Sequence, residues 1–279
     1  MKNKIYVLFI IIIFLILFKK IFNKIEPFQD QAQDQAIVQP TTSGSTTTEA
    51  VTTESPDDII VRSGDNIPVL VNKTIINGDV TIYDIDDISF LREIVEITGN
   101  LSFIGTTLTN LEGLSSLERV EGGVNIDRNY SLVNLYGLNS LTSVGANLDI
   151  INNSLLTNLE GLNNLTSVGG GLVIQDNGGL INLVGLNSLT SVGAKLSITH
   201  NDELTNLVGL NSLTSVGQYL NIEVNEGLIN LDGLNSLTSV GGDLVIIGNN
   251  SLLNLDGLIN LTSVGGNEII IEDNQQISD

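Results

Sequence analysis

Residues 148–171 read LDIINNSLLTNLEGLNNLTSVGGG, and residues 172–195 read LVIQDNGGLINLVGLNSLTSVGAK. Leu, Ile, Asn and Gly recur at the same places in both stretches. The same 24-residue unit also starts at residues 124, 196, 220 and 244. Self-similarity at a fixed short period is the signature of a solenoid, in which each repeat packs only on its neighbours. This repeat therefore decides the fold class.

Each unit opens with the pattern L-x-I, as in Leu172 and Ile174. Apolar residues two apart point to the same side of a strand, so each unit is expected to begin with a short strand that faces a core. The later apolar positions fall three apart, but Gly185 interrupts them, which predicts tight turns. The L-T-S-V sequence predicts a second short strand. A helix in each unit, as in ordinary leucine-rich repeats, is the alternative.

These units predict an all-β parallel β-helix in which stacked rungs build one column of Leu, Ile and Val. Irregular rungs start at Val80 and Leu101, and a truncated rung starts at Ile269, which gives about eight rungs in all. We expect four parts of the chain, each defined by its composition and repeat pattern. They are an N-terminal signal-anchor segment (1–25), a linker (26–56), an irregular cap with the first rung (57–98) and the repeat solenoid (99–279).

One Asn recurs at the same place in every regular unit, five residues after the start of the strand. An Asn amide offers both a donor and an acceptor to backbone groups in a buried turn, so stacked Asn side chains are expected to form a ladder between rungs. The ladder is predicted to consist of Asn129, Asn153, Asn177, Asn201, Asn225 and Asn249.

The motif L-x-I-x-x-N-x-x-L-x-N-L-x-G-L-x-x-L-x-S-V-G-G resembles the receptor L domain, a leucine-rich-repeat-like β-helix found in growth-factor receptor ectodomains. The resemblance covers roughly residues 78–274. It implies a right-handed parallel β-helix that binds protein ligands. Related copies occur in microbial and viral surface proteins. No ligand-contact motif of the family has a counterpart in these rungs.

The N-terminal region predicts membrane attachment. Residues 5–18 are uninterruptedly apolar and lie between Lys pairs, as in a single-pass anchor or a cleaved signal peptide, which remains the alternative. Residues 26–56 are rich in Gln, Thr and Ser, which is typical of a disordered linker or an O-glycosylated stalk. We therefore expect a membrane protein whose repeat domain lies outside the cytoplasm, at a cell or virion surface, or a secreted protein if the segment is cleaved.

Composition excludes several classes of function. The chain has no Cys and one His, so it has neither a disulfide framework nor a Cys- or His-based zinc site, and we expect no enzyme activity, metal or cofactor. The net charge is −21, and all of it falls in residues 57–279, which carry six basic and 27 acidic residues. A domain with this net negative charge repels phosphate backbones, which argues against nucleic acid as a partner.

The predicted function is recognition of, or adhesion to, a protein or carbohydrate ligand. Turn residues are nearly identical between rungs, whereas outward strand positions differ, as in a contact surface or under neutral drift. The expected ligand face consists of Asp149, Asn152, Gln175, Asp176, Thr199, His200, Asn221 and Glu223. A structural spacer or coat protein without a ligand is the alternative.

Two further patterns bear on a surface location. One Thr column makes binding to ice or another regular surface a remote alternative: Thr142, Thr166, Thr190, Thr214, Thr238 and Thr262. Glycosylation sequons also occur outside the Asn ladder. The candidate glycan acceptors are Asn72, Asn100, Asn164 and Asn260, although an Asn- and Thr-rich repeat also generates sequons by accident.

Overall fold

The computed structural model describes residues 58–65, 70 and 72–277. The anchor expected at 1–25 and the linker expected at 26–56 lie outside these residues. Over the described ranges, no helix has the length and apolar character needed to cross a bilayer.

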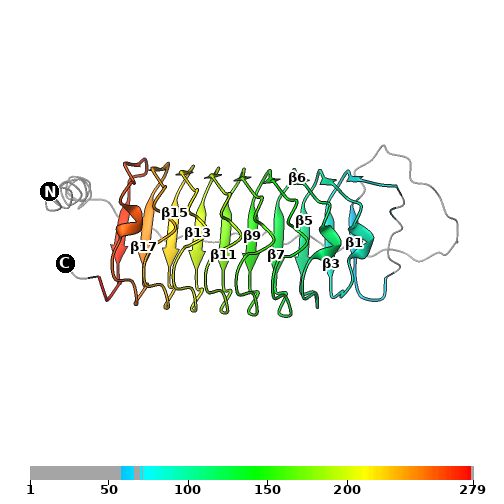
Figure 1. Cartoon of the computed structure of the whole chain (residues 1–279), viewed down its shortest axis with the longest axis horizontal. Helices are drawn as coiled ribbons and strands as arrows, with labels where there is room; N and C mark the ends of the chain where they lie inside the picture. Colours follow the sequence, from blue (N-terminus) through cyan, green and yellow to red (C-terminus); the bar gives the residue numbers. More distant parts are fainter. Residues whose placement is uncertain (1–57, 66–69, 71, 278–279) are drawn as a thin grey trace. The chain divides into compact units, whose positions relative to one another are not determined.

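Residues 56–279 form one compact unit that contains a parallel β-solenoid (Figure 1). Sheet A has ten strands: β1 (Ile59–Val61), β3 (Val80–Tyr83), β5 (Leu101–Ile104), β7 (Val124–Asp127), β9 (Leu148–Ile151), β11 (Leu172–Gln175), β13 (Leu196–Thr199), β15 (Leu220–Glu223), β17 (Leu244–Ile247) and β19 (Ile269–Glu272). Sheet B has nine strands: β2 (Ile75–Ile76), β4 (Glu96–Ile97), β6 (Arg119–Val120), β8 (Ser143–Val144), β10 (Ser167–Val168), β12 (Ser191–Val192), β14 (Ser215–Val216), β16 (Ser239–Val240) and β18 (Ser263–Val264).

The repeat sets the register of both sheets. Leu172 pairs with Leu148 on one side and Leu196 on the other, so equivalent residues stack from rung to rung. The two strands expected in each unit are confirmed. The estimate of about eight rungs was low, because the ten strands of sheet A are joined by nine turns of the solenoid. Strand β1 was missed because its IIV sequence is not followed by the Asn that marks later rungs.

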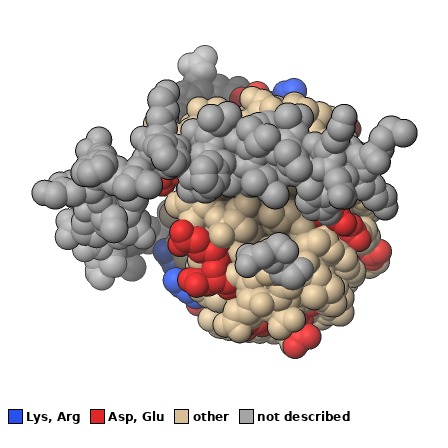
Figure 2. Space-filling view, turned by 90° about the vertical axis from the view of Figure 1, so that its left-hand side faces the viewer, with Lys and Arg blue, Asp and Glu red and all other residues tan. Residues whose placement is uncertain are grey.

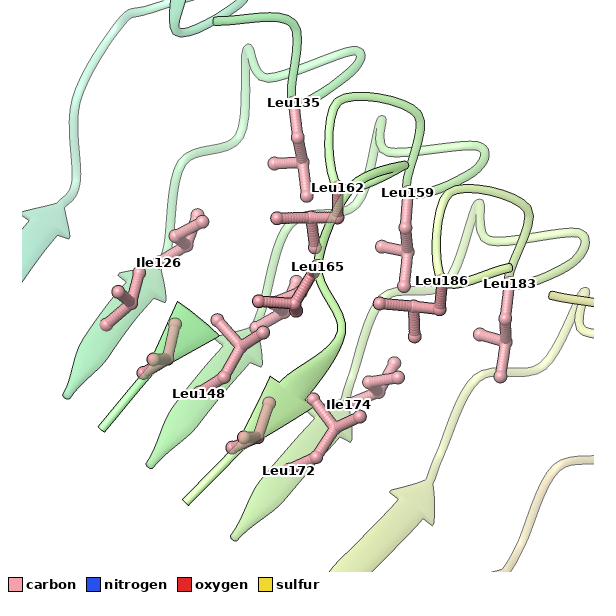
Figure 3. Close-up of a cluster of buried hydrophobic side chains, with 14 of the residues drawn as sticks. Ile126, Leu135, Leu148, Leu159, Leu162, Leu165, Leu172, Ile174, Leu183 and Leu186 are labelled. Carbon is pink, nitrogen blue, oxygen red and sulfur yellow. The ribbon is translucent and has the colours of Figure 1, made fainter. Parts of the chain in front are cut away.

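The core is a continuous column of aliphatic side chains. Leu172 and Ile174 point inward from β11 and are completely buried. Figure 3 shows Leu135, Leu159 and Leu183 entering the same interior in one orientation from three successive turns. Full burial of a Leu or Ile side chain stabilises the fold by roughly 1.5–3 kcal/mol, so each rung depends on its neighbours for most of its stability.

Tight turns, rather than helices, connect the strands. Helical turns in the described part of the chain are confined to three short 3-10 segments: η1 (Ser89–Leu91), η2 (Glu112–Leu114) and η3 (Asp256–Leu258). The alternative of a helix in every unit is therefore wrong. Gly185, at φ +119°, shows why: a Cβ there would overlap the carbonyl oxygen of Leu159 in the preceding turn. The close approach of successive turns leaves no room for a helix.

The Asn column forms a hydrogen-bonded ladder through the interior. The amide Nδ2 of Asn201 donates to the carbonyl oxygens of Ile174 (3.0 Å) and Thr199 (3.0 Å) and to Oδ1 of Asn225 (3.2 Å). The backbone N–H of Asn177 donates to Oδ1 of Asn201 at 3.1 Å. Each side chain thus joins two strands of sheet A and the Asn of the next rung.

The two ends of the ladder differ. At its start, the backbone N–H and the hydroxyl of Thr106 both donate to Oδ1 of Asn129, at 2.9 and 2.7 Å. At its other end, Oδ1 of Asn274 accepts from the backbone N–H of Asn249 at 3.0 Å. Asn249 is completely buried, whereas Asn274 is partly exposed. Loss of a ladder bond is consequently most costly in the middle rungs, where water cannot replace it.

Candidate functional site

Sheet A presents its outer face in three parallel rows. The first row holds the second residue of each strand, the second row holds the fourth, and the third row holds the residue that follows the strand. Neighbouring residues within a row lie ~4.8 Å apart, which is the spacing of adjacent strands. The expected ligand face falls on these rows over β9, β11, β13 and β15.

The structure brings most of the expected residues together. Gln175, Thr199 and Glu223 are adjacent in the second row, because they pair across β11, β13 and β15. Asp149 and Asn221 lie in the first row, but Val173 and Ser197 separate them. The eight residues therefore form one cluster with an apolar interruption.

Backbone conformation determines the residue types of the third row. Asn152 (φ +59°), Asp176 (φ +54°) and His200 (φ +56°) all adopt the left-handed conformation. Asn, Asp and His are enriched there among non-glycine residues, and other members of the row are Gly105 and Gly248. Part of the residue choice in the third row therefore reflects backbone conformation rather than ligand contact or drift.

Val224 departs from this rule. It belongs to the third row and has φ +51°, although a β-branched side chain disfavours that region strongly. The backbone of this rung is therefore strained beside the expected ligand face. The frequency of Asn, Asp, His and Gly in this row was a recognisable signal of left-handed geometry in the sequence, although Arg128 and Val224 also belong to it.

The outer face of sheet A is less polar than its sequence predicts. Thr199 is only 6% exposed, because its short side chain lies between the longer Gln175 and Glu223. Val173 in the first row is also only 6% exposed. Ile151 pairs with Gln175 and extends the second row with an apolar side chain. The face thus combines carboxylates and amides with aliphatic side chains.

Two side-chain acceptors among the described residues of this face lack a hydrogen-bond partner, whereas Gln175 donates to Asp176 at 2.8 Å. In the described part of the chain, no ion pair involves Asp149, Asp176 or Glu223. One side-chain oxygen each of Asp149 and Asn221 is shielded from solvent and forms no hydrogen bond. Burial raises the pKa of Asp149, and the charge of Lys195 opposes this shift. The face therefore presents hydrogen-bond acceptors and negative charge.

The acidic groups of this face do not form a metal site among the residues that the structure describes. Over the described residues, no group of three or more His, Asp or Glu side chains could hold a metal ion. The acidic turn near the first rung is structural, since Asp87 accepts hydrogen bonds from the backbone N–H (2.7 Å) and the hydroxyl (3.1 Å) of Ser89. The arrangement of sheet A is suited to non-covalent recognition.

The Thr column lies next to the strands of sheet B and is hydrogen-bonded along its length. The hydroxyl of Thr190 donates to the carbonyl oxygen of Thr166 at 3.0 Å, and the hydroxyl of Thr214 donates to that of Thr190 at 3.0 Å. Identical bonds join the rungs on either side. These bonds between rungs account for the recurrence of Thr without a ligand.

The expected glycan acceptors differ in their surroundings. Asn72 is exposed in a turn. Nδ2 of Asn100 donates to Asp79 (3.1 Å), while its Oδ1 accepts the backbone N–H of Gly123 (2.8 Å). Each of the other two donates to a backbone carbonyl oxygen of the preceding rung, as the pairs Asn164–Asn139 and Asn260–Asn235. The geometry therefore favours Asn72 among the four.

The surface around the solenoid is acidic. Figure 2 looks onto the end that carries the last rungs, where carboxylates lie around the outline and few basic side chains are visible. This agrees with the 27 acidic and six basic residues of the region 57–279. The outer face of sheet A is thus part of a generally negative surface.

Comparison with known families identifies the repeat. The receptor L domain model matches residues 72–145. Residues 72–145 are similar to the receptor L domain. The match extends from β2 to β8, and the later rungs continue the same stacking in register. No curated protein matches the chain.

The receptor L domain match indicates a ligand-binding domain of receptor type. It confirms the resemblance drawn from the repeat motif, over part of the 78–274 range in which that motif was recognised. Domains of this type are typically non-catalytic, in agreement with the absence of an enzyme-like composition. Among the described residues, the two buried side-chain oxygens without a hydrogen bond belong to Asp149 and Asn221, and both residues lie on the outer face of sheet A.

Proposed function

We propose that this chain is a membrane-anchored surface protein that binds a basic region of a protein ligand through the outer face of sheet A. The observation that carries the proposal is a cluster of acceptors over β9, β11 and β15. Asp149 and Asn221 each have one side-chain oxygen without a hydrogen bond, and among the described residues Asp176 and Glu223 form no ion pair. Lys and Arg side chains of a ligand would supply donors and positive charge to this group.

The rigidity of the sheet supports this proposal. Parallel pairing fixes Gln175, Thr199 and Glu223 in one row at ~4.8 Å steps, so a ligand contacts several rungs without an ordering cost on the receptor side. Ile151 adds apolar contact beside the charged groups, whereas Val173 is only 6% exposed and contributes little. A mixed apolar and acidic surface is typical of protein recognition.

The location of the protein is part of the same proposal. The apolar segment at 5–18 anchors the chain, and the repeat domain lies on the extracytoplasmic side. Protease treatment of sealed, right-side-out membranes tests this orientation. Digestion of the repeat domain is the expected result, and its protection would contradict the proposal.

The ligand face is tested by charge reversal on the full-length chain. The variant combines Asp176→Lys, His200→Lys and Glu223→Lys, and the matched control places two Lys residues elsewhere, as Asp86→Lys and Glu118→Lys. Attachment of each purified protein to candidate host surfaces is measured at rising salt. We expect the triple variant to lose attachment, the control to retain it, and wild-type attachment to weaken as salt screens the charges.

Two other outcomes distinguish the alternatives. Attachment that survives the triple variant but is lost on changing Thr190 and Thr214 would move the site to the Thr column. Attachment abolished by glycosidase treatment of the host surface would assign a carbohydrate ligand instead of a protein. Absence of attachment to every surface would favour a structural spacer, a role that agrees with the near-identical turns of the rungs.

A further inference from the structure

Exposed apolar side chains concentrate on one face of the solenoid that belongs to neither sheet. We call it the turn face, and it consists of residues 130–136, 154–160, 178–184, 202–208, 226–232 and 250–256. Twelve large hydrophobic residues are exposed in the described part of the chain, and eight of them lie on the turn face. They are Tyr130, Val133, Tyr136, Leu155, Ile181, Val208, Ile229 and Leu253.

Backbone hydrogen bonds hold the centre of this face in register. The N–H of Ile181 donates to the carbonyl oxygen of Thr157 (3.0 Å), Thr205 donates to Ile181 (3.1 Å), and Ile229 donates to Thr205 (2.9 Å). Leu253 continues the line by donating to Ile229 (2.9 Å). Val133, Ile181, Ile229 and Leu253 therefore lie in one fixed stripe along the rungs, in which Thr157 and Thr205 occupy the intervening positions.

Carboxylates border this stripe on both sides, and the turn face contains no Lys or Arg. Asp202, Glu203 and Glu226 precede the stripe in their rungs, and all three are exposed. On the other side lie Glu160, which is half-buried, and the exposed Asp232 and Asp256. The surface is therefore an apolar stripe with a short row of three carboxylates on either side.

We infer that the turn face binds an amphipathic α-helix of a partner protein, with an apolar side flanked by Lys and Arg. The charges of such a helix complement the two carboxylate rows, and its apolar side covers Ile181, Ile229 and their neighbours. This site lies outside sheet A and does not depend on the function proposed for sheet A.

The spacing of the stripe suits a helix. Val133, Ile181 and Ile229 occupy alternate rungs and lie ~9.6 Å apart, close to the ~10.5 Å between helical residues seven apart. From Val133 to Leu253 the stripe spans five rung steps, or ~24 Å, which matches a helix of ~16 residues. One face of such a helix would contact the whole stripe.

Electrostatics disfavour other occupants. A second copy of the chain would bring its own carboxylate rows against the first, and like charges at an interface are repulsive. Anionic lipid surfaces and nucleic acids carry phosphate groups, which the carboxylate rows also repel. A cationic partner with an apolar side makes favourable contacts with the apolar stripe and is attracted by the carboxylates that border it.

The test uses the full-length chain and a helical peptide of about 18 residues composed of Leu and Lys, with Leu on one side. A scrambled peptide of the same composition and a peptide with Glu in place of Lys are the probe controls. The stripe variant is Ile181→Ser with Ile229→Ser, and the border variant is Glu203→Gln with Glu226→Gln. Ile259→Ser changes a residue that is 60% exposed outside the turn face and is the matched control.

Fluorescence anisotropy should show that wild type binds the Leu–Lys peptide and that the stripe variant binds it about tenfold more weakly or worse. The border variant should bind more weakly at low salt and show a flatter salt dependence, while Ile259→Ser binds as wild type does. Unchanged circular dichroism of every variant establishes that each has folded. Equal binding of the Leu–Lys and scrambled peptides, or equal binding by wild type and stripe variant, would overturn the inference. So would a wild-type dimer in sedimentation that the stripe variant abolishes.

Discussion

Replacement of Asn201 by Ala should destabilise the solenoid locally, around the rung that carries it. Asn201 is completely buried, and its side chain makes five hydrogen bonds, two through Oδ1 and three through Nδ2. The substitution leaves the buried backbone N–H of Asn177 without its acceptor. It also removes the donor that reaches the carbonyl oxygen of Ile174.

A buried polar group without a partner costs about 1–3 kcal/mol, and these groups share one network, so their costs are not additive. We therefore expect a loss of about 3 kcal/mol in the free energy of unfolding. Two controls set the scale. Gln175→Ala on the outer face should change the free energy of unfolding by less than about 0.5 kcal/mol. Asn274→Ala, at the partly exposed end of the ladder, should have an effect between those of Gln175→Ala and Asn201→Ala.

Hydrogen exchange on the full-length chain is the appropriate assay, because rungs of a solenoid open locally as well as globally. A loss of about 3 kcal/mol corresponds to exchange of the Asn177 amide that is roughly a hundredfold faster. Amides in β3, far from the substitution, should change much less. Equal effects of Asn201→Ala and Gln175→Ala would refute the reasoning, since buried and exposed amides would then contribute alike.

Three further predictions concern backbone strain and charge. Val224→Asn should stabilise the chain by about 1 kcal/mol in urea unfolding, because Asn tolerates the left-handed conformation that Val disfavours; a destabilisation would show that Val224 is unstrained. Gly185→Ala should lower the urea midpoint clearly, whereas Gly178→Ala, which meets no atom within 4 Å, should leave it nearly unchanged; similar midpoints would contradict the close turn packing. Burial raises the pKa of Asp149, so its carboxyl group binds a proton more tightly in the folded chain than in the unfolded chain. The stability of the folded chain therefore falls as pH rises from the ordinary carboxyl pKa through the raised pKa. Asp149→Asn should therefore stabilise the chain at neutral pH, with an advantage that shrinks on acidification; an advantage that grows at low pH would contradict the sign.

The repeat predicted the architecture because each of its features has one structural cause. The alternation in Leu172 and Ile174 fixes a strand, and a constant unit length places equivalent residues in register. Gly185 and the Asn of each turn favoured tight turns, and the alternative of a helix in each unit was excluded only by the structure. The terminal rungs were harder to predict, since β1 (Ile59–Val61) has strand-forming residues but neither the unit length nor the Asn that identify a rung.

The candidate site was predictable only in outline. Period-two alternation identifies the outward positions of sheet A, but it does not show that Thr199 is shielded by its two longer neighbours. The left-handed backbone at Asp176 and His200 depends on how each strand ends, which the alternation of apolar residues within a strand does not predict. The sequence did not single out Ile181 and Ile229, because their exposure on one aligned face follows from hydrogen bonds between successive turns.

The most direct test of the proposed ligand face is site-specific photo-cross-linking. A photoreactive amino acid replaces Gln175 on the outer face of sheet A or, as the control, Ser191 in sheet B, in full-length chain bound to its host surface. The account predicts that the sheet A probe cross-links to a protein segment rich in Lys and Arg and that the sheet B probe does not. Cross-links from Ser191 alone, or from Gln175 to segments without basic residues, would contradict it.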